Sequence, residues 1–392
     1  RFGERIVGVS HSRLIEFSVR QVEGSRDLDA FLKATRLIFR DDPNWIEPLY
    51  LERKEHLDPK KNPYFKSSEV AYWIAEQKGR VIGRISAQVN RVHLERYRDA
   101  TGHFGFLDAI DNQEVFAALF AAAEGWLRSK GLKRIVGPFS LSINDQSGLL
   151  VDGFEDPPVM MMGHAWPYYA DRIEACGYLK VKDLIAYNYS KELEVPPVVQ
   201  KLLTRAERSG RIAFRPLDLT RYDEEFRTIL DIFNDAWSDN WGFLPFSSEE
   251  VSYLTKAMKP LIDKNLVIIG EADGTAAAMV VILPNFYEAI FDLGGRVFPF
   301  GWLKLLWRLK VKGVTTGRMP LMGVRRKFQS TSLGAALAFG VIREARKNAK
   351  AKGIVAAELS WVLEDNQAVR HVIETMGAIP YKTYRLYQKD LA

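Results

Sequence analysis

Alternating apolar and polar positions predict two β-hairpins that lie far apart in the chain. Residues 73–83 (WIAEQKGRVIG) form two strand-like runs around Lys-Gly, and residues 267–277 (VIIGEADGTAA) repeat this pattern around Asp-Gly. Short strand-like runs that flank a two-residue turn containing glycine are typical of hairpins. We therefore expect strands on both sides of Gly79 and of Gly274.

A regular alternation of strands and helices follows the second hairpin. Residues 318–324 predict a strand, 332–350 a long helix, 353–362 another strand and 364–377 a helix that ends at Gly377. Glycine is common at this position because it adopts the left-handed conformation that terminates helices. This order predicts a fold of the α/β (α+β) type, with a mixed, mostly antiparallel sheet flanked by helices.

The two hairpins belong to a longer internal repeat. Three landmarks recur at offsets of 195 to 200 residues: Gly79 with Gly274; Asn44-Trp45 with Asn240-Trp241; and Gly177, Lys182 and Tyr187 with Gly377, Lys382 and Tyr387. Self-similarity at one period indicates a duplicated unit. Because paired prolines in VPPVVQ (195–200) break regular structure, we expect two tandem domains, 1–195 and 196–392.

The composition and net charge of the chain limit the kinds of molecule that it is expected to bind. The chain of 392 residues is 47% apolar and 27% charged, with net charge +6, so a packed core is expected. This mild positive charge favours phosphate-bearing cofactors or anionic membranes, and we expect no nucleic acid. Cys176 is the single cysteine, which predicts a reducing, cytoplasmic location. No spacing typical of metal ligands occurs, so we expect no metal.

A candidate phosphate-binding turn lies in RRKFQSTSLGAALAFGVIREA (325–345). Backbone N–H groups at a helix start lack internal partners, and small residues let a pyrophosphate approach them. The alternative is a helix N-cap with a small-residue packing face. We expect a charged side chain at Gly334 to weaken binding. The predicted cofactor-binding residues here are Met322, Val324, Arg325, Gln329, Ser330, Thr331, Ser332, Leu333, Gly334 and Ala335.

The equivalent segment of the first copy, residues 107–126, lacks the features of a phosphate-binding turn. No glycine stands at its turn, and Asp108, Asp111 and Glu114 lie at the helix start. Carboxylates cap a helix well but repel a pyrophosphate. We therefore expect one binding site, in the C-terminal copy, while the N-terminal copy shapes the acceptor pocket.

The loop-rich segment 137–169 has no counterpart in the second copy. We interpret it as a lid that holds an amine, with Asn144, Asp152 and His164 as substrate contacts; the alternative is a loop held by Asx turns. Asp145 and Glu358 are the candidate bases, although Glu358 also suits an ion pair. Two further candidates are Asp292 as an amine contact and Tyr387 as an acid, with a plain sheet role as the alternative for Tyr387.

Residues 297–313 (VFPFGWLKLLWRLKVKG) place charged residues, which are typical of a protein surface, next to several aromatic residues. Three interpretations stay open. The segment is an amphipathic helix that covers the sheet, it lines an acyl-chain channel through residues such as Trp302, or it lies on an anionic membrane surface, where Trp and Lys residues concentrate. The third interpretation predicts peripheral contact with the inner membrane surface.

These motifs resemble the GNAT N-acyltransferase superfamily. Its acyl-CoA motif, Gln/Arg-x-x-Gly-x-Gly/Ala, stands here as Gln329 to Gly334, with Ser332 in place of the first glycine. The resemblance implies that Asn366 binds the pantetheine arm. A Tyr that many members carry seven residues later is Ile373 here, so the usual acid is missing or supplied elsewhere.

Nearly the full chain is similar to one branch of tandem GNAT proteins, the bacterial ceramide synthases. The resemblance rests on GPFSLSINDQSGLLVDGFEDPP, FPFGWLKLLWRLK and ELSWVLEDNQAVRHVIETMGAIPYKTYRLYQKDL. It implies direct transfer of a long-chain acyl group from acyl-CoA to a lipid amine such as 3-ketosphinganine or sphinganine. Two alternatives are an acetyltransferase acting on small-molecule or protein amines, and a non-catalytic acyl-CoA- or lipid-binding protein.

Overall fold

The computed structural model describes residues 16–190 and 192–391. Its first half alternates strands and helices around one long hairpin. The elements are β1 (Ser18–Gln21), α1 (Gly24–Ile38), α2 (Tyr50–His56), α3 (Tyr64–Ser67), β2 (Ser68–Gln77), β3 (Arg80–Asn90), α4 (Arg91–Tyr97), β4 (Thr101–Ala109), α5 (Gln113–Ser129), β5 (Arg134–Gly137), β6 (Phe139–Ser140), β7 (Gln146–Ser147), β8 (Leu149–Asp152), α6 (Tyr168–Glu174) and β9 (Leu179–Ser190).

The second half repeats this order after an additional helix. The elements are α7 (Pro197–Arg208), β10 (Ile212–Pro216), α8 (Tyr222–Trp237), α9 (Ser248–Met258), β11 (Val267–Ala272), β12 (Thr275–Pro284), α10 (Tyr287–Ile290), α11 (Gly301–Trp307), β13 (Thr316–Val324), α12 (Ser332–Ala351), β14 (Ala356–Leu363), α13 (Gln367–Thr375) and β15 (Ile379–Asp390). Short helical turns occur at Leu219–Arg221, Lys264–Leu266, Arg308–Lys312 and Arg326–Phe328.

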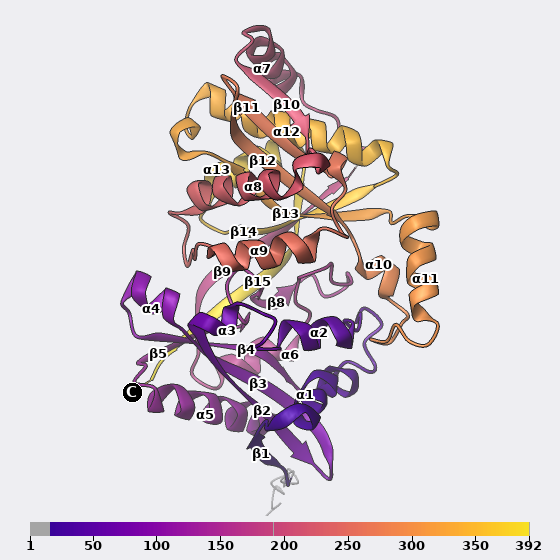
Figure 1. Ribbon diagram of the computed structural model, residues 1–392. Helices are drawn as coiled ribbons and strands as arrows, with labels where there is room; N and C mark the ends of the chain where they lie inside the picture. The colour runs from indigo at the N-terminus through magenta and orange to yellow at the C-terminus, as the bar shows by residue number, and fades with distance from the viewer. Residues whose placement is uncertain (1–15, 191, 392) are drawn as a thin grey trace, which may run out of the picture.

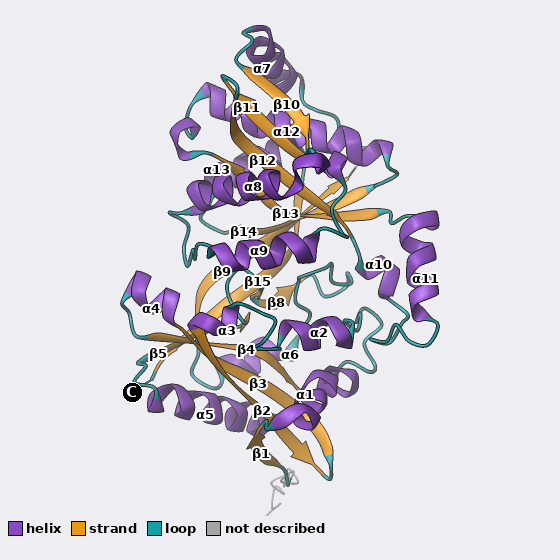
Figure 2. Cartoon of the chain, in the orientation of Figure 1, coloured by secondary structure: helices purple, strands orange, loops and turns teal. Residues whose placement is uncertain are grey.

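Both halves contribute to one 13-stranded sheet. Its order is β1-β2-β3-β4-β5-β15-β9-β14-β13-β12-β11-β10, with β8 paired to β15. The pairs β4–β5 and β13–β14 are parallel, while the other neighbours are antiparallel. The mixed, mostly antiparallel sheet with flanking helices, visible in Figure 2, is the fold class that the pattern predicted.

Each half inserts its last strand into the sheet of the other half. β15 lies between β5 and β9, and β9 lies between β14 and β15. Figure 1 shows β15 running from the second half into the first, so that the C-terminus lies beside β5 and α5. The division expected at residues 195 and 196 falls in the connection between β9 and α7.

Apolar clusters cover both faces of the sheet. In the first half, α5 packs on β2 and β3, and α1 also contacts β3. In the second half, α12 and α7 bury one cluster against the sheet, and α8 buries another together with the 160–161 loop. Because β9 and β15 contribute tyrosines to these clusters, their exchange joins the two cores.

The elements expected in the second half are present with small shifts of their ends. The strands span Thr316–Val324 and Ala356–Leu363, and the long helix spans Ser332–Ala351. Gly377 follows the last helix with φ of +92°. Both hairpins turn through two residues with positive φ, Lys78-Gly79 and Asp273-Gly274, which is the geometry expected of a two-residue type I′ turn.

Candidate functional site

β13 and β14 separate along their length and leave a wedge in the sheet. They pair only through Thr316–Met319 and Ala356–Leu359. Beyond this point β13 follows β12 as far as Val324, and β14 follows β9 as far as Leu363. Main-chain groups on the diverging edges can therefore bind an extended ligand as another strand would.

Two tryptophans border this wedge. The indole N–H of Trp237, at the end of α8, donates to the carbonyl of Met322 at 2.9 Å. The ring of Trp237 also packs edge-on against Trp361 of β14, with ring centroids 5.9 Å apart. The carbonyl of Met322, a predicted cofactor contact, thus already accepts one hydrogen bond from within the protein.

The predicted phosphate-binding turn leads from the open end of β13 into α12. Thr331 caps the helix, because its Oγ1 accepts from the N–H of Gly334 at 3.0 Å and donates to the carbonyl of Phe328 at 2.6 Å. Ser330 is in the left-handed region, with φ of +61°. The helix itself leaves the first-turn amides of Ser332 and Leu333 unpaired, so they are available to an anion.

Gly334 has a packing role that the sequence interpretation did not foresee. A Cβ atom added there would lie 2.0 Å from the carbonyl oxygen of Phe328, well inside van der Waals contact. A charged residue at Gly334 would therefore disturb the turn itself, whatever its effect on a phosphate. A charged substitution at Gly334 would therefore change the turn geometry and phosphate binding at the same time.

The polar residues around the turn have protein partners. Arg325 pairs with Asp231 at 2.7 Å, and Arg326 pairs with Asp239 at 3.0 Å. Gln329 Nε2 donates to the carbonyl of Val324 at 2.9 Å. Carboxylates on α8 and just beyond its end thus pair with Arg325, a predicted cofactor contact, and with its neighbour Arg326, while Leu333 and Ala335 pack on the core of the second half.

Asn366 lies just beyond β14, at the open side of the wedge. It caps α13, with its Oδ1 accepting from the N–H of Val369 at 3.2 Å. The remaining amide N–H groups of Asn366 are the ones a ligand in the wedge can approach. Its predicted contact with the pantetheine arm stays a prediction.

The corresponding turn of the first half carries carboxylates, as expected. Asp108 forms a buried ion pair with Arg84 at 2.7 Å, and Asp111 pairs with Arg172 at 2.7 Å. Asn112 caps α5 by accepting from Val115 N–H at 3.0 Å. These groups stabilise the helix start and present negative charge where the second half presents free amides.

A buried polar cluster lies at the point where β13 and β14 part. Glu358 of β14 accepts hydrogen bonds from the hydroxyls of Ser360 and Tyr381. Arg318 of β13, opposite Glu358 in the parallel register, donates to Ser360 Oγ at 3.0 Å and to the carbonyl of Met160 at 3.0 Å. The side chains of Glu358 and Arg318 are only 4% and 3% exposed, so their charges interact strongly.

Burial and the Glu358 charge shape the acid–base properties of the neighbouring residues. Both raise the pKa of the Tyr381 hydroxyl far above its ordinary value, so it stays protonated. Desolvation lowers the pKa of Lys382, which is buried beside it and donates to the carbonyl of Pro157 at 2.8 Å. The cluster therefore combines one carboxylate with a hydroxyl donor and a lysine whose charge is disfavoured.

A cavity of about 560 Å³ opens next to this cluster. Glu358 and Tyr381 line it together with Asn44 and Trp45 of the first half, and Phe291 lies on its rim. Other lining residues are Pro43, Ile46, Asp156, Pro157, Pro158, Val159, Asn188, Asn285, Glu288, Lys312, Thr316, Gly317, Ala356 and Ala357. The site is thus built by both halves, and an amine in the cavity can reach a carboxylate.

The other predicted residues of the 137–169 loop lie elsewhere. Asp145 accepts from the N–H and the hydroxyl of Ser142 at 3.2 and 3.1 Å, which is the turn-stabilising alternative. Asn144 donates to the carbonyl of Leu244 at 3.0 Å. His164 is buried against Asp42 at 2.7 Å, and Asp152 is exposed at the end of β8. The structure does not bring these residues to Glu358.

Tyr387 lies in the core of the first half because β15 crosses into it. Its side chain is 0% exposed, and its hydroxyl donates to Glu174 at 3.1 Å. Tyr381, six residues earlier on the same strand, is the tyrosine that contacts Glu358. Because β15 extends across both halves, the hydroxyls of Tyr381 and Tyr387 lie in different surroundings. Their spacing in the sequence alone did not show this.

The segment around α11 exposes an unusual amount of apolar surface. Its exposed large side chains are Phe291, Phe298, Phe300, Trp302, Leu303, Leu306, Trp307, Leu309 and Val311. Asp292 does not face the cavity freely; it pairs with Arg308 at 2.6 Å and with Lys304, which lowers its pKa. α11 stands at the side of the molecule and does not cover the sheet (Figure 1).

Arg318, Ser360 and Tyr381 were not identified from the sequence. A weak signal was present, because Arg318 and Glu358 are charges inside otherwise apolar strands, and a buried charge needs a partner. In the described residues, no helix is long and apolar enough to cross a membrane. The described residues also contain no group of three or more His, Cys, Asp or Glu placed to hold a metal ion.

Comparisons with solved structures establish the fold. A tandem GNAT protein from the clavulanic acid biosynthesis pathway matches 96% of this chain and 99% of its own, with TM-score 0.55 and 11% identity. A GCN5-related glucosamine N-acetyltransferase region of a fungal multi-domain GH3 β-N-acetylglucosaminidase matches 96% of this chain and 38% of its own, with TM-score 0.58 and 15% identity.

Comparisons of sequence establish the family. No family model matches the chain. It is 46% identical over 377 residues to the bacterial ceramide synthase of Caulobacter vibrioides (strain NA1000 / CB15N), covering 96% of this chain and 98% of that protein. It is 45% identical over 374 residues to protein YghO of Escherichia coli K12, covering 95% of each. The chain therefore belongs to the family of the bacterial ceramide synthase and is an acyl-CoA-dependent N-acyltransferase with a tandem GNAT fold.

Proposed function

We propose that this enzyme transfers a long-chain acyl group from acyl-CoA to the amine of a sphingoid base such as 3-ketosphinganine or sphinganine. The observation that carries the proposal is the buried Glu358 cluster at the parting of β13 and β14, beside a cavity of about 560 Å³. The name of the Caulobacter relative supports a sphingoid-type acceptor.

Acyl-CoA binds along the wedge in this proposal. The first-turn amides of α12 at Ser332 and Leu333 hold the pyrophosphate, since they point out of the helix start. The pantetheine arm extends between β13 and β14, past Trp237 and Trp361. This direction carries the thioester toward the point where the strands meet, at Met319 and Leu359.

The chemistry follows from the groups around that point. The amine enters the cavity from the first-half side as an ammonium ion and gives one proton to Glu358, directly or through one water. Its lone pair then attacks the thioester carbonyl carbon in the ternary complex, and a backbone N–H on 319–324 stabilises the oxyanion. The nitrogen of this intermediate releases its second proton to water, the carbon–sulfur bond breaks, and the proton held by Glu358 is transferred to the thiolate through the Tyr381 hydroxyl or water.

The aromatic segment gives the lipid a route to this cavity. Phe291 and Lys312 line the cavity, and they flank the exposed side chains of residues 298–311. Tryptophan and phenylalanine next to cations favour the interface of an anionic bilayer. We propose that this segment lies on the inner membrane surface, so that a sphingoid base moves from the bilayer to Glu358 without crossing water.

A thiol-release assay tests the substrate assignment. Acyl-CoAs of about two to sixteen carbons are compared with sphingoid bases and lysine peptides as acceptors. Fastest release with a long-chain donor and a sphingoid base is expected, because the apolar surface and cavity suit lipids. Preference for acetyl-CoA with a peptide or small amine would favour an acetyltransferase, and binding without any release would favour a non-catalytic lipid-binding protein.

The variant Glu358→Gln tests the proton acceptor. The amide keeps the shape but cannot take a proton, so we expect kcat to fall by about 10²–10⁴-fold, with acyl-CoA affinity in calorimetry nearly unchanged. Asp156→Asn is the matched control, because Asp156 is an exposed carboxylate on the same cavity. An equal loss in both variants, or no loss in Glu358→Gln, would reject Glu358 as the base.

A further inference from the structure

A smaller cavity, of about 80 Å³, adjoins the cavity beside Glu358. Trp45, Ile46 and Pro158 line both cavities, so the two spaces share one wall. The other walls of this side cavity include parts of α1, α2, β4, the β6–β7 hairpin and α10. A space of this size holds a few water molecules or a substituent of a few non-hydrogen atoms, and not a long alkyl chain.

The charged groups of the side cavity are compensated within the protein. Arg84 and Asp108 both line it and pair with each other at 2.7 Å. Arg53 also lines it and donates from Nε to Glu52 at 2.6 Å, whereas its Nη1 has no hydrogen-bond partner among the described residues. The side cavity therefore offers an N–H donor without a net charge. A neutral oxygen suits it better than a phosphate, which the two carboxylates would repel.

Three neutral polar groups of the side cavity lack a protein partner, namely the Ser140 hydroxyl, the Gln146 amide and the Tyr287 hydroxyl. None of them forms a hydrogen bond with another described residue, and each keeps accessible surface, unlike the sealed hydroxyl of Tyr384. Ser140 is only 8% exposed, so the open space that its hydroxyl meets is the cavity that it lines. Buried polar groups of this kind require water or a ligand as partner.

The local fold directs these groups toward one space. Ser140 of β6 lies directly opposite Gln146 of β7 in their antiparallel pairing, which places both side chains on the same face of the hairpin. Gly163 runs alongside, because a Cβ atom added there would lie 3.2 Å from Nε2 of Gln146. Burial raises the pKa of the Tyr287 hydroxyl, so this group stays protonated and can donate. Donors from the hairpin and from α10 thus meet at the side cavity.

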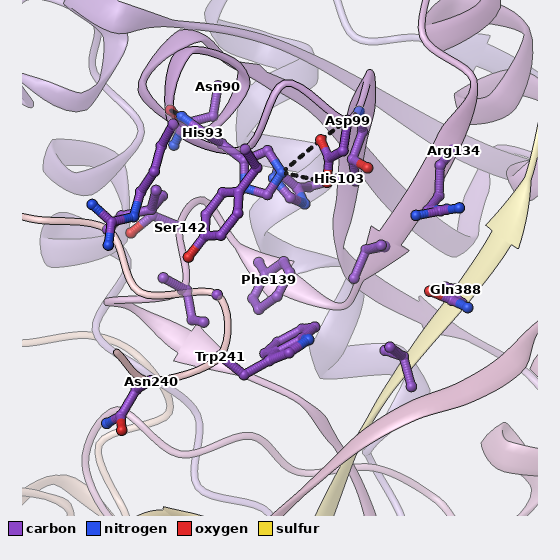
Figure 3. A pocket seen from close by; sticks show the side chains of 18 of the residues that line it. Asn90, His93, Asp99, His103, Arg134, Phe139, Ser142, Asn240, Trp241 and Gln388 are labelled. Atoms are coloured by element: carbon purple, nitrogen blue, oxygen red, sulfur yellow. Dashed lines mark hydrogen bonds and ion pairs between the residues drawn. The ribbon is translucent and has the colours of Figure 1, made fainter. Parts of the chain in front are cut away.

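The larger cavity of the first half, shown in Figure 3, is a separate space. It measures about 420 Å³, and none of the described residues that line it also lines the side cavity or the cavity beside Glu358. In its wall, His93 contacts Asp99 at 3.2 Å. A substituent close to the reacting amine is therefore expected in the side cavity, which shares a wall with the cavity beside Glu358.

We propose that the side cavity binds an oxygen substituent on the carbon next to the amine carbon of the acceptor, and that Ser140, Gln146 and Tyr287 determine this specificity. The acceptor class is then a long-chain amino alcohol or amino ketone, and not a plain long-chain amine. The oxygen accepts from Tyr287 and from the Gln146 amide, and a hydroxyl donates in turn to Ser140 Oγ. This inference rests on the proposed function, because the amine must lie beside Glu358 for the neighbouring oxygen to enter the side cavity.

Two acceptors that differ only in oxygen, sphinganine and 2-aminooctadecane, test the proposal. Thiol release with one long-chain acyl-CoA gives kcat/KM for each acceptor. We expect a preference of at least about 100-fold for sphinganine, because a site built to bind a hydroxyl rejects the analogue without it. Ser140→Ala, Gln146→Leu and Tyr287→Phe should each reduce this preference about tenfold, by weakening sphinganine alone. Tyr253→Phe is the matched control, because Tyr253 lines neither cavity, and should leave the preference unchanged.

Saturation-transfer NMR without acyl-CoA separates this inference from the proposed function. The probes are 2-amino-1,3-propanediol and 2-aminopropane, which differ in the same oxygens. We expect saturable binding of the diol, with binding at least about fivefold weaker for 2-aminopropane and for the diol in Tyr287→Phe. If neither long-chain amine causes thiol release, the proposed function fails, and this measurement alone decides the role of the side cavity.

Tyr287→Phe decides where another variant does not fold, because it removes a hydroxyl that has no partner among the described residues. Equal kcat/KM for the two long-chain amines, or an unchanged preference in Tyr287→Phe, would overturn the proposal and leave the side cavity as a water site. Where no transfer occurs, equal binding of the two short amines, or no saturable binding of the diol, would overturn it in the same way.

Discussion

Gly334 fits two interpretations of its motif, phosphate binding and close backbone packing. A small residue at a helix start suits phosphate approach, yet here the missing side chain is required by the carbonyl of Phe328, 2.0 Å from where a Cβ atom would lie. The cap of Thr331 on the Gly334 N–H tightens the same turn. The local backbone geometry therefore explains this glycine before any ligand is considered.

This geometry predicts that Gly334→Ala destabilises the protein. The added methyl group must push the Phe328 carbonyl away, at a cost of about 1–3 kcal/mol in the free energy of unfolding. Urea unfolding measures it. Gly125→Ala is the control, because a Cβ atom in that helix meets nothing within 4 Å. Equal stability of Gly334→Ala and the native protein would contradict the packing role.

His103 predicts a pH dependence of stability. Its pKa is lowered from the ordinary 6.5 to about 3 in the folded protein, so between these values only the unfolded chain takes up the proton. The free energy of unfolding should fall by about 1.4 kcal/mol per pH unit as pH drops through this window. Burial also lowers the pKa of the neighbouring His93, which acts in the same direction.

Urea titrations at pH 4, 5 and 6 measure this slope. In His103→Phe the slope should be reduced by about one proton's contribution, leaving those of His93 and of His56, whose pKa burial also lowers. Asp99, which faces His93, has a lowered pKa and acts mainly below its ordinary value of 3.8, outside the measured range. An unchanged slope in the variant would show that His103 titrates normally.

At the scale of elements, α11 and its flanks differ from every covering helix of the fold. A helix that packs on the sheet buries an apolar stripe, as α12 does with Leu337 and Val341. α11 has no buried residue, and its Trp302, Leu303, Leu306 and Trp307 side chains are exposed. Of the three interpretations of residues 297–313, an ordinary covering helix does not fit this exposure.

The membrane interpretation predicts loss of vesicle binding in Trp302→Ser/Trp307→Ser. Each exposed indole contributes on the order of 1 kcal/mol or more when buried in the interface, so the double variant should partition roughly tenfold or more weakly to anionic vesicles. Sedimentation with vesicles measures it. Leu219→Ser, which changes an exposed leucine elsewhere, should have no effect, and an equal effect of both changes would contradict a specific surface.

At the scale of the whole molecule, strand exchange makes the two halves depend on each other. β15 carries Tyr384, Leu386 and Tyr387, all 0% exposed, into the core of the first half. β9 carries Tyr187 and Tyr189 into the core of the second half. The cavity beside Glu358 also combines both halves, because Asn188 of the exchanged strand β9 and the Asn44-Trp45 loop line it together with Glu358 and Tyr381.

The exchange predicts that fragments 1–195 and 196–392 do not fold alone. Each fragment would expose the apolar slot that the other half's strand fills. The free energy lost by exposing this apolar surface far exceeds the stability of a typical domain. Coexpressed fragments should copurify as a soluble, helical complex, whereas each fragment expressed alone should aggregate. Monomeric, cooperatively unfolding fragments would show that the exchanged strands are dispensable.

Local patterns were sufficient for the elements and for part of the site. The hairpins, the long helix from Ser332 and the carboxylates at the start of α5 follow from short-range periodicity, turn chemistry and capping, which depend on neighbouring residues. The repeat was also readable, because duplicated landmarks keep their spacing. Glu358 was a candidate base before its partners were known.

Tertiary structure alone decided which distant residues surround Glu358. Arg318 and Tyr381 meet it because β13 and β14 run parallel and β15 crosses between the halves, and such pairings join residues with no local relation in sequence. Ser360, by contrast, is two residues away on β14. The same crossing buries Tyr387 away from the site, while Asp145 and His164 are held by Ser142 and Asp42. Patterns along the chain encode local conformation, whereas the partners of a buried charge depend on the whole packed sheet.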